Sequence, residues 1–311
     1  MANYSDIKGF TVQTLSSDPA ASVASTGSWA SGGSLNNGLV GNAGFGTYTA
    51  AVSAGGTKSP GITNVVEHYD GSSWTNATAI PAATDSIGSC GTQTAGLVFG
   101  GQRPPNTNAT FEYDGSSWTA GGNLNTTRRD LIGAGTQTAG LAACGAIDPP
   151  FSAEAEQYNG SAWTTVAEAN TAARSRAGGG TSTSAMAYGG FTPPYTSNAE
   201  TWNGSAWTEV SNISSIRGIM GGGGSSNTDQ ITFGGYGGPP GSQYYANTEF
   251  WNGSSWTELN DLSGARSTKH SLPSSPTANQ LYAGGHTPPN TYYTTTTEEW
   301  STTPSALFQK Q

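Results

Sequence analysis

The chain has 311 residues, 45 of them glycine, and a formal net charge of −9, so it is an acidic, glycine-rich polypeptide. It has no run of Lys or Arg, which argues against a nucleic-acid partner because phosphate binding needs clustered cations. No segment approaches the roughly 18 consecutive apolar residues of a membrane span, so we expect no membrane insertion.

The first part of the chain, residues 1–24, is polar and lies outside any repeat. It contains one strand-like stretch, Phe10–Leu15. It has no basic region followed by an apolar stretch, so it does not predict a secretory signal. We expect residues 1–24 to be a leader or attachment arm, residues 25–303 to form one domain, and residues 304–311 to be a C-terminal tail.

A seven-residue phrase of the type Tyr-Asp-Gly-Ser-Ser-Trp-Thr then recurs along the chain. Its Trp residues are spaced by 44, 45, 44 and 49 residues, and a partial copy at Gly27–Trp29 lies 45 residues before the first of them. A fixed period of this size indicates repeated supersecondary units. The Trp residues expected to pack between these units are Trp29, Trp74, Trp118, Trp163, Trp207 and Trp256.

One repeat, residues 124–163, shows what each unit contains. Leu131–Thr136, Ala139–Gly145, Glu154–Tyr158 and Ser161–Val166 are four short runs of strand character, separated by turn or loop residues. Asn159-Gly160 between the last two runs is a strong hairpin signal because both residues tolerate a positive φ. Each repeat therefore predicts a sheet of four antiparallel strands.

Counting the repeated features predicts how the array closes. There are six glycine-rich second strands and six third-strand aromatic residues, but Trp29 precedes all of them and no Trp follows Trp300. The last unit would then take its fourth strand from near Trp29 and its first three from Ser271–Trp300. Such a ring has no exposed sheet edge. An open solenoid is the alternative, and it would need polar caps that the sequence lacks.

The paired Gly, the following aromatic residue and the Trp behind it resemble the repeats of kelch-type β-propellers, from about Ser25 to Trp300. The resemblance implies an all-β fold: a six-bladed, kelch-like propeller with four-stranded antiparallel blades, closed by an N-terminal strand around Trp29. It also implies that the first strand of each blade lines the central channel. The loops joining strands two and three would share one face with the loops between blades.

The sequence offers little catalytic chemistry. His68, His270 and His286 do not make the ligand set of the copper-radical propellers, and no Ser-His-Asp order or phosphate-binding loop is present. Cys90 and Cys144 occupy different repeat positions, so we expect two unpaired buried thiols. We therefore expect no catalytic residue, no metal and no cofactor.

The loops that join strands two and three indicate a binding face. They carry Pro pairs together with aromatic residues that fall outside the repeated phrase, and the loops between blades carry Arg. Tyr with a few polar partners is a common recognition chemistry. The candidate binding residues are Phe151, Tyr195, Tyr236, Tyr244, Tyr245, Tyr292, Tyr293, Arg128, Arg174, Arg217 and Arg266. Two structural alternatives are that the Pro pairs fix the loop path and that each Arg bonds carbonyl groups of the adjacent blade.

The leader, the Gly-Ser-Trp that follows it and the near-identical phrases Gly91–Leu97 and Gly135–Leu141 resemble proteins of marine bacteriophage genomes. The resemblance implies a non-enzymatic virion or tail protein. It would bind a host-surface receptor such as a glycan, or other virion proteins through residues 1–24. An extracellular location is the alternative to the virion. The alternative functions are a purely architectural virion decoration and a carbohydrate-active enzyme that uses Asp130 or Asp148.

Overall fold

The computed structural model describes residues 27–238, 243–288 and 292–302, and these residues form strands, turns and loops. The expected leader, residues 1–24, and the expected tail, residues 304–311, lie outside the described residues. Within the described part of the chain, no helix is long and apolar enough to cross a membrane.

Five sheets of four antiparallel strands follow one another along the chain. Blade 1 contains β2 (Ala43–Thr47), β3 (Ala50–Ala54), β6 (Val66–Tyr69) and β7 (Trp74–Ala77). Blade 2 contains β8 (Gly88–Thr92), β9 (Ala95–Phe99), β10 (Thr110–Tyr113) and β11 (Trp118–Ala120). Blade 3 contains β12 (Ile132–Thr136), β13 (Ala139–Ala143), β14 (Ala155–Tyr158) and β15 (Trp163–Val166). Blade 4 contains β16 (Ala177–Gly180), β17 (Ala185–Tyr188), β18 (Ala199–Trp202) and β19 (Trp207–Val210). Blade 5 contains β20 (Gly221–Ser226), β21 (Asp229–Phe233), β24 (Thr248–Trp251) and β25 (Trp256–Glu258).

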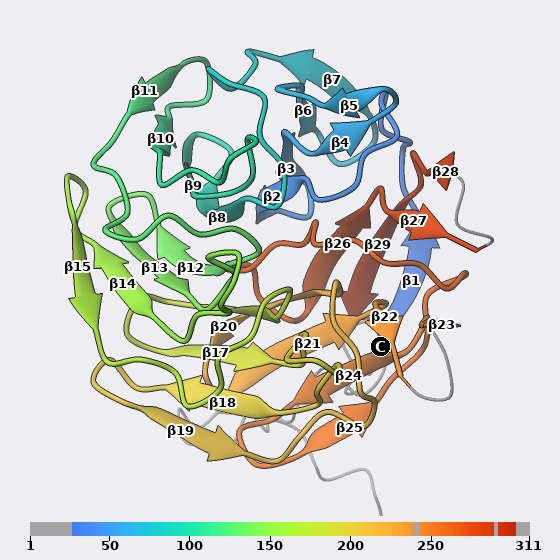
Figure 1. Cartoon of the computed structure of the whole chain (residues 1–311). Helices are drawn as coiled ribbons and strands as arrows, with labels where there is room; N and C mark the ends of the chain where they lie inside the picture. Colours follow the sequence, from blue (N-terminus) through green and yellow to red (C-terminus); the bar gives the residue numbers. More distant parts are fainter. Residues whose placement is uncertain (1–26, 239–242, 289–291, 303–311) are drawn as a thin grey trace, which may run out of the picture.

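The sixth sheet joins the two ends of the described chain. It contains β26 (Asn279–Ala283), β29 (Thr297–Thr302) and β1 (Gly27–Ser31), in the order β1-β29-β26. Strand β1 pairs with β29 in antiparallel register, with Trp29 opposite Trp300. The predicted closure by a strand around Trp29 is confirmed. The six sheets lie in a ring around a central axis, and the protein is a six-bladed β-propeller (Figure 1).

Three small hairpins rise from the loops between second and third strands. They are β4 (Thr57–Lys58) with β5 (Gly61–Ile62), β22 (Tyr236–Gly237) with β23 (Gln243–Tyr244), and β27 (His286–Thr287) with β28 (Tyr292–Tyr293). The 2–3 loops of blades 2, 3 and 4 hold a single bridge in the same place, such as Phe191 opposite Tyr195.

Blade 6 differs from the prediction at its innermost position, where the described chain forms no strand. The segment Lys269–Ser274 lies there instead and reaches across the axis. The amide of Gly180 in blade 4 donates to Pro273 O at 2.8 Å, and Ser274 Oγ donates to Gly135 O in blade 3 at 2.8 Å. The sequence of Ser271–Pro276, Ser-Leu-Pro-Ser-Ser-Pro, explains the departure, because Pro cannot donate to a strand ladder. This segment occupies the channel, and a space of about 30 Å³ remains between it and the inner strands.

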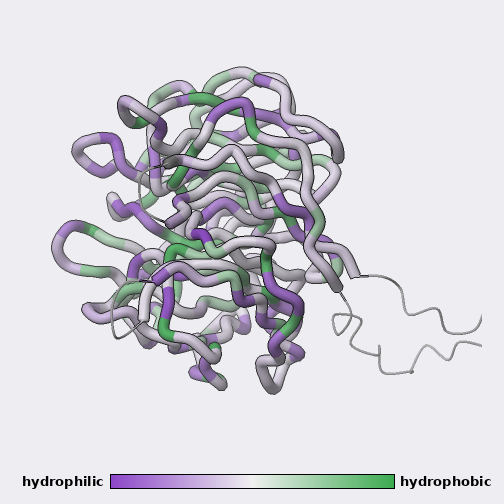
Figure 2. The backbone as a smooth tube through the Cα atoms, turned by 90° about the vertical axis from the view of Figure 1, so that its right-hand side faces the viewer, coloured by the Kyte–Doolittle hydropathy of each residue, from purple (hydrophilic) through white to green (hydrophobic). Residues whose placement is uncertain are grey.

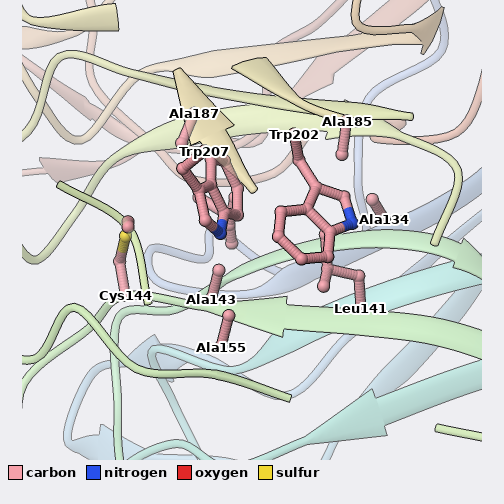
Figure 3. Close-up of a cluster of buried hydrophobic side chains, with 11 residues drawn as sticks. Ala134, Leu141, Ala143, Cys144, Ala155, Ala185, Ala187, Trp202 and Trp207 are labelled. Atoms are coloured by element: carbon pink, nitrogen blue, oxygen red, sulfur yellow. The ribbon is translucent and has the colours of Figure 1, made fainter. Parts of the chain in front are cut away.

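The repeated Trp residues pack between blades, as predicted. Each lies against the third-strand aromatic residue of its own blade, with ring centroids 4.4–5.5 Å apart. Each indole N–H also donates to the preceding blade, for example from Trp163 to Thr110 Oγ1 at 2.9 Å. Figure 3 shows one such junction, in which Trp202 and Trp207 of blade 4 cover Ala143 and the other small side chains of blade 3. Small residues on one blade thus leave room for large ones on the next.

Candidate binding face

The loops between blades and the loops joining second and third strands meet on one face of the ring, which we call the loop face. In every blade, one residue of the inter-blade segment forms an antiparallel bridge with the residue that follows the glycine pair, or that follows Cys144-Gly145 in blade 3. These bridges are Val40–Thr57, Asp85–Gln102, Arg129–Ala146, Arg174–Phe191, Gly218–Tyr236 and Ser267–His286. The second glycine of the pair donates to the next inter-blade segment, as Gly101 N does to Arg128 O at 2.8 Å. The loop face is therefore built by one repeated backbone arrangement.

Five aromatic side chains form a continuous row on this face, which we call the aromatic ladder: Phe151, Phe191, Tyr195, Tyr236 and Tyr244. Successive ring centroids along the row are 5.8, 4.9, 5.9 and 5.0 Å apart, with steep interplanar angles. All five side chains are half-buried. The row crosses the rims of blades 3, 4 and 5, and it brings together four of the predicted binding residues.

One part of the sequence interpretation was wrong: most of these aromatic residues do follow a repeat. Phe151, Tyr195, Tyr244 and Tyr293 all occupy the same place, the second bridge residue of the 2–3 loop. Loop insertions before this place shift its spacing, so the sequence period hides it. Ile62 and Asn106 hold the same place in blades 1 and 2. The ladder therefore forms where this repeated structural position holds an aromatic residue in three successive blades, 3, 4 and 5.

The remaining predicted Tyr residues lie apart from the ladder. The ring of Tyr245 packs on the guanidinium of Arg217, 5.5 Å from its centroid. Tyr293 lies in blade 6 against His286, with ring centroids 5.1 Å apart. The backbone of Tyr292 belongs to β28, and its side chain lies outside the described residues.

Three of the four predicted Arg residues are buried inside the blades and are not available on the loop face. Arg128, Arg217 and Arg266 have side chains 0–3% exposed, and each pairs with a third-strand Glu of its own blade. Arg128 Nη2 donates to Glu156 Oε1 at 2.7 Å, and Arg217 Nη2 donates to Glu249 Oε1 at 2.8 Å. Arg128 Nη1 also donates to two carbonyl groups. These Arg residues therefore bond carbonyl groups, as the structural alternative predicts. The carbonyl groups belong to the blade that follows the loop in the sequence.

Arg174 does not share the repeat position of these three residues. Ala173 holds that position in blade 4, because Gly145 N donates to Ala173 O as Gly101 N does to Arg128 O. Arg176, further along the same segment, pairs with Glu200 at 2.7 Å instead. Arg174 is left at the rim of the channel, with a side chain 31% exposed and its guanidinium 5.2 Å from the ring centre of Phe191.

A cluster of charged groups surrounds the mouth of the channel on the loop face. Arg129 donates to both carboxylate oxygens of Asp148, at 2.7 and 3.0 Å. Asp130 lies between three cations, with Arg129 at 3.3 Å, Arg174 at 3.5 Å and Lys269 Nζ at 3.6 Å. Lys269 comes from the segment that fills the channel. The two acids suggested for an enzyme, Asp130 and Asp148, are therefore both ion-paired.

Burial and neighbouring charges change the proton affinities of this cluster. Burial raises the pKa of Asp85, partly opposed by the hydrogen bond from Thr57 and increased by the charge of Asp130. Burial lowers the pKa of Lys269, and Asp130 partly opposes this. The hydrogen bond from Arg129 lowers the pKa of Asp148. The mouth therefore contains a carboxyl group, Asp85, that takes up a proton more readily than a free aspartate.

The sequence interpretation missed Asp85, Phe191, Lys269 and His286. Phe191 and His286 could have been found, because both directly follow a glycine pair, as Tyr236 does. Lys269 gave no signal, because its place depends on the irregular path of blade 6. Among the described residues, no group of three or more His, Cys, Asp or Glu side chains could hold a metal ion. Cys90 and Cys144 are buried and unpaired, as predicted.

The chain leaves the propeller on the face opposite to the loop face. Strand β29 starts at its 2–3 loop and ends at Thr302, which lies opposite Gly27 in the β1 register. Third strands of the other blades end at the Asp-Gly or Asn-Gly turns, so both described ends lie on this turn face. Figure 2 shows the two ends side by side at the right of the molecule. Gly27 and Thr302 therefore lie away from the loop face.

Comparison with known proteins supports the fold and no more than the fold. No protein-family model matches the chain, and no curated protein matches it. A solved structure of the protein YjhT is similar, with a TM-score of 0.70 and 15% sequence identity, over 85% of this chain and 95% of that chain. At this level of identity, the similarity shows that the chain has the fold of a six-bladed β-propeller.

Proposed function

We propose that this chain is a non-enzymatic, kelch-like propeller of a bacteriophage virion that binds a glycan receptor on the host surface through its loop face. The tail or another exposed position of the particle would carry it. The phrases that resemble phage virion proteins motivate the location. The aromatic ladder carries the binding part of the proposal, because half-buried rings at the surface suit the flat faces of sugars.

The placement of the chain ends supports the same proposal. Gly27 and Thr302 lie on the turn face, so an arm formed by residues 1–24 could hold the protein on a particle while the ladder points outward. Several copies on one particle would add avidity to a weak individual contact. A neighbouring virion protein is the alternative partner for the same face.

The test replaces ladder residues in the virion-borne protein. The triple variant Tyr195→Ser, Tyr236→Ser, Tyr244→Ser should lower adsorption of the particle to host cells at least tenfold, since losing about 1.4 kcal/mol of binding free energy changes affinity tenfold. Tyr48→Ser is the matched control, because Tyr48 is a half-buried Tyr in the β2–β3 turn on the opposite face. Adsorption that is unchanged in the triple variant while the particles remain intact would falsify receptor binding through the ladder.

Two alternative functions, an architectural decoration and a carbohydrate-active enzyme, predict different experimental results. If the ladder contacts neighbouring subunits in a cryo-EM map of the virion, the protein is an architectural decoration. A carbohydrate-active enzyme is favoured by one observation, the environment of Asp85: burial and the nearby charge of Asp130 raise the pKa of Asp85, as expected for one member of an acid–base pair. Release of reducing sugar from host-surface glycans by the purified protein, abolished in Asp85→Asn, would support the enzyme instead.

A further inference from the structure

A cavity that is partly open to solvent lies at the mouth of the channel on the loop face. It has a volume of about 230 Å³ and is lined by residues from several blades, among them Val40, Asp85, Arg174 and His286. Its floor includes Lys269, from the segment that fills the channel. Pockets for drug-sized ligands measure roughly 300–1,000 Å³, so this cavity suits a single ring.

Three residues that line this cavity contain buried polar atoms without a protein partner. These atoms are Asp85 Oδ1, Arg174 Nε and His286 Nδ1. The other oxygen of Asp85 accepts a hydrogen bond from Thr57 Oγ1 at 2.6 Å, so the carboxyl group is held in place while Oδ1 has no partner. Buried polar groups are nearly always satisfied in folded proteins. These three atoms are covered by neighbouring protein atoms, so a molecule in the cavity would meet the same residues through their other polar atoms.

The charges of the lining indicate what kind of molecule could do so. Arg129 is already neutralised by Asp148, and Asp130 lies between Arg174 and Lys269. A cation would meet Arg174 or Lys269, and an anion would meet Asp130. Hydroxyl groups both donate and accept, so a neutral molecule with several hydroxyl groups can satisfy acidic, basic and imidazole partners at once.

The cavity is also continuous with the proposed binding surface. Arg174 lines the cavity and at the same time packs over Phe151 and Phe191, 5.8 and 5.2 Å from their ring centres. These two rings begin the aromatic ladder. A chain of sugars lying along the ladder would thus reach the cavity at its end.

We propose that the cavity at the channel mouth binds one neutral sugar residue through its hydroxyl groups, with Asp85, Arg174 and His286 as direct partners. This proposal rests on the proposed function and deepens it, since it places the end of the glycan. The same chemistry could come from a free monosaccharide or from the last residue of a glycan chain, and the experiment separates these sources.

The experiment titrates the full-length protein with methyl glucoside, methyl galactoside, methyl mannoside and N-acetylglucosamine, using isothermal calorimetry and saturation-transfer NMR. Glycerol serves as an acyclic polyol. Wild-type protein should bind at least one of the pyranosides, and Asp85→Ala and Arg174→Met should each weaken that binding about tenfold, equal to about 1.4 kcal/mol. Asp114→Asn is the control, because Asp114 lies in a turn on the opposite face and Asn159 already holds that place in blade 3.

Near-UV circular dichroism of each variant confirms that the Trp-rich core is intact. Binding of monosaccharides with the expected loss in both cavity variants supports the proposal, and tighter binding of an oligosaccharide than of its terminal residue identifies a chain end as the natural source. No binding of any pyranoside, or equal binding of pyranosides and glycerol, overturns it, and the cavity then holds only water. The triple Tyr→Ser variant tests adsorption, and the cavity variants test monosaccharide binding. The receptor proposal and the cavity proposal can therefore fail independently.

Discussion

Buried arginines show how single residues hold the blades and loops together. In blade 3, Arg128 and Glu156 are 0% and 1% exposed, and the same Glu accepts from the Asn125 amide at 2.7 Å. In blade 2 both partners are different: Thr84 holds the place of Arg128, and Phe111 holds the place of Glu156. The next residue, Glu112, accepts a hydrogen bond from the Tyr158 hydroxyl. In blade 1, by contrast, Leu39 holds the Arg position, and the buried Glu67 accepts from the backbone amides of Asn36 and Asn37. Each buried Glu thus keeps donors, because a buried charge without partners is strongly unfavourable.

This pattern predicts an unequal effect of single and double substitutions. Arg128→Met should lower the free energy of unfolding by about 3–5 kcal/mol, since it leaves Glu156 buried without a cation. Adding Glu156→Leu should recover part of that loss, although the Cys144 and Glu154 carbonyl groups still lack the Arg128 donor. Urea unfolding of both singles and the double variant measures this cycle. A double variant at least as unstable as the sum of the singles would contradict it.

His270 gives the protein a predictable dependence on pH. It is fully buried, and burial lowers its pKa from 6.5 to about 4. The unfolded chain therefore binds a proton near pH 6.5 that the folded protein refuses. The free energy of unfolding is therefore unaffected by protonation of His270 above pH 6.5. It decreases as the pH falls towards 4, by up to about 3 kcal/mol, because the unfolded chain gains a proton there and the folded protein does not.

The variant His270→Gln isolates this contribution. Its free energy of unfolding should change less between pH 6.5 and 4 than that of the wild type, measured by urea titration at each pH. His68 and His286, whose pKa values are also lowered, and Asp85, whose pKa is raised, remain in both proteins. An identical pH slope in the two proteins would mean that His270 is already protonated or solvated in the folded state.

At the scale of elements, strand β1 closes the ring of the described propeller. It covers the edge of β29, and Trp29 packs on Phe233 of blade 5 and Trp300 of blade 6, with centroids 4.7 and 5.5 Å away. Its indole also donates to Thr248 Oγ1 at 2.9 Å. Strand β1 therefore joins the first residues of the propeller to its last two blades.

Deleting residues 1–31 should open the ring. Loss of the Trp29 packing alone corresponds to about 3–5 kcal/mol, and the uncovered edge of β29 can pair with other molecules. We expect a lower melting temperature and self-association in size-exclusion chromatography. Deleting residues 1–26 is the control and should leave both measurements close to those of the wild type. Equal behaviour of the two deletions would show that β1 does not close the ring energetically.

The elements that sequence predicts well are those whose residues repeat in register. The Asp-Gly and Asn-Gly turns, the glycine pairs and the paired aromatic residues recur because each blade meets the same neighbours, and all of them appear in the structure. The inner part of blade 6 was harder to predict from the sequence, because a segment containing Leu272-Pro273 replaces the expected inner strand. The path of this segment depends on contacts with four other blades. The site was harder still, because Asp85, Arg174 and His286 are distant in sequence and meet only when the ring closes.

At the scale of the whole molecule, the glycine-rich inner strands and the segment that fills the channel depend on each other. A Cβ at Gly179 would lie 1.9 Å from Pro273 O and 2.9 Å from Gly223 Cα, and both are backbone atoms that cannot rotate away. Pro273 O also accepts the Gly180 amide, so the segment cannot shift without losing that bond. The centre of the ring is thus packed against backbone on several sides.

Gly179→Ala should therefore destabilise the protein by at least about 1–3 kcal/mol, the usual cost of forcing a methyl group into a packed core. The control is Gly61→Ala in β5, where an added Cβ meets no atom within 4 Å and should change stability by no more than about 1 kcal/mol in either direction. Thermal and urea unfolding compare the two. If Gly179→Ala is as stable as Gly61→Ala, the channel must have room that the segment Lys269–Ser274 does not occupy. The floor of the proposed sugar site would then be open, because Lys269 belongs to that segment.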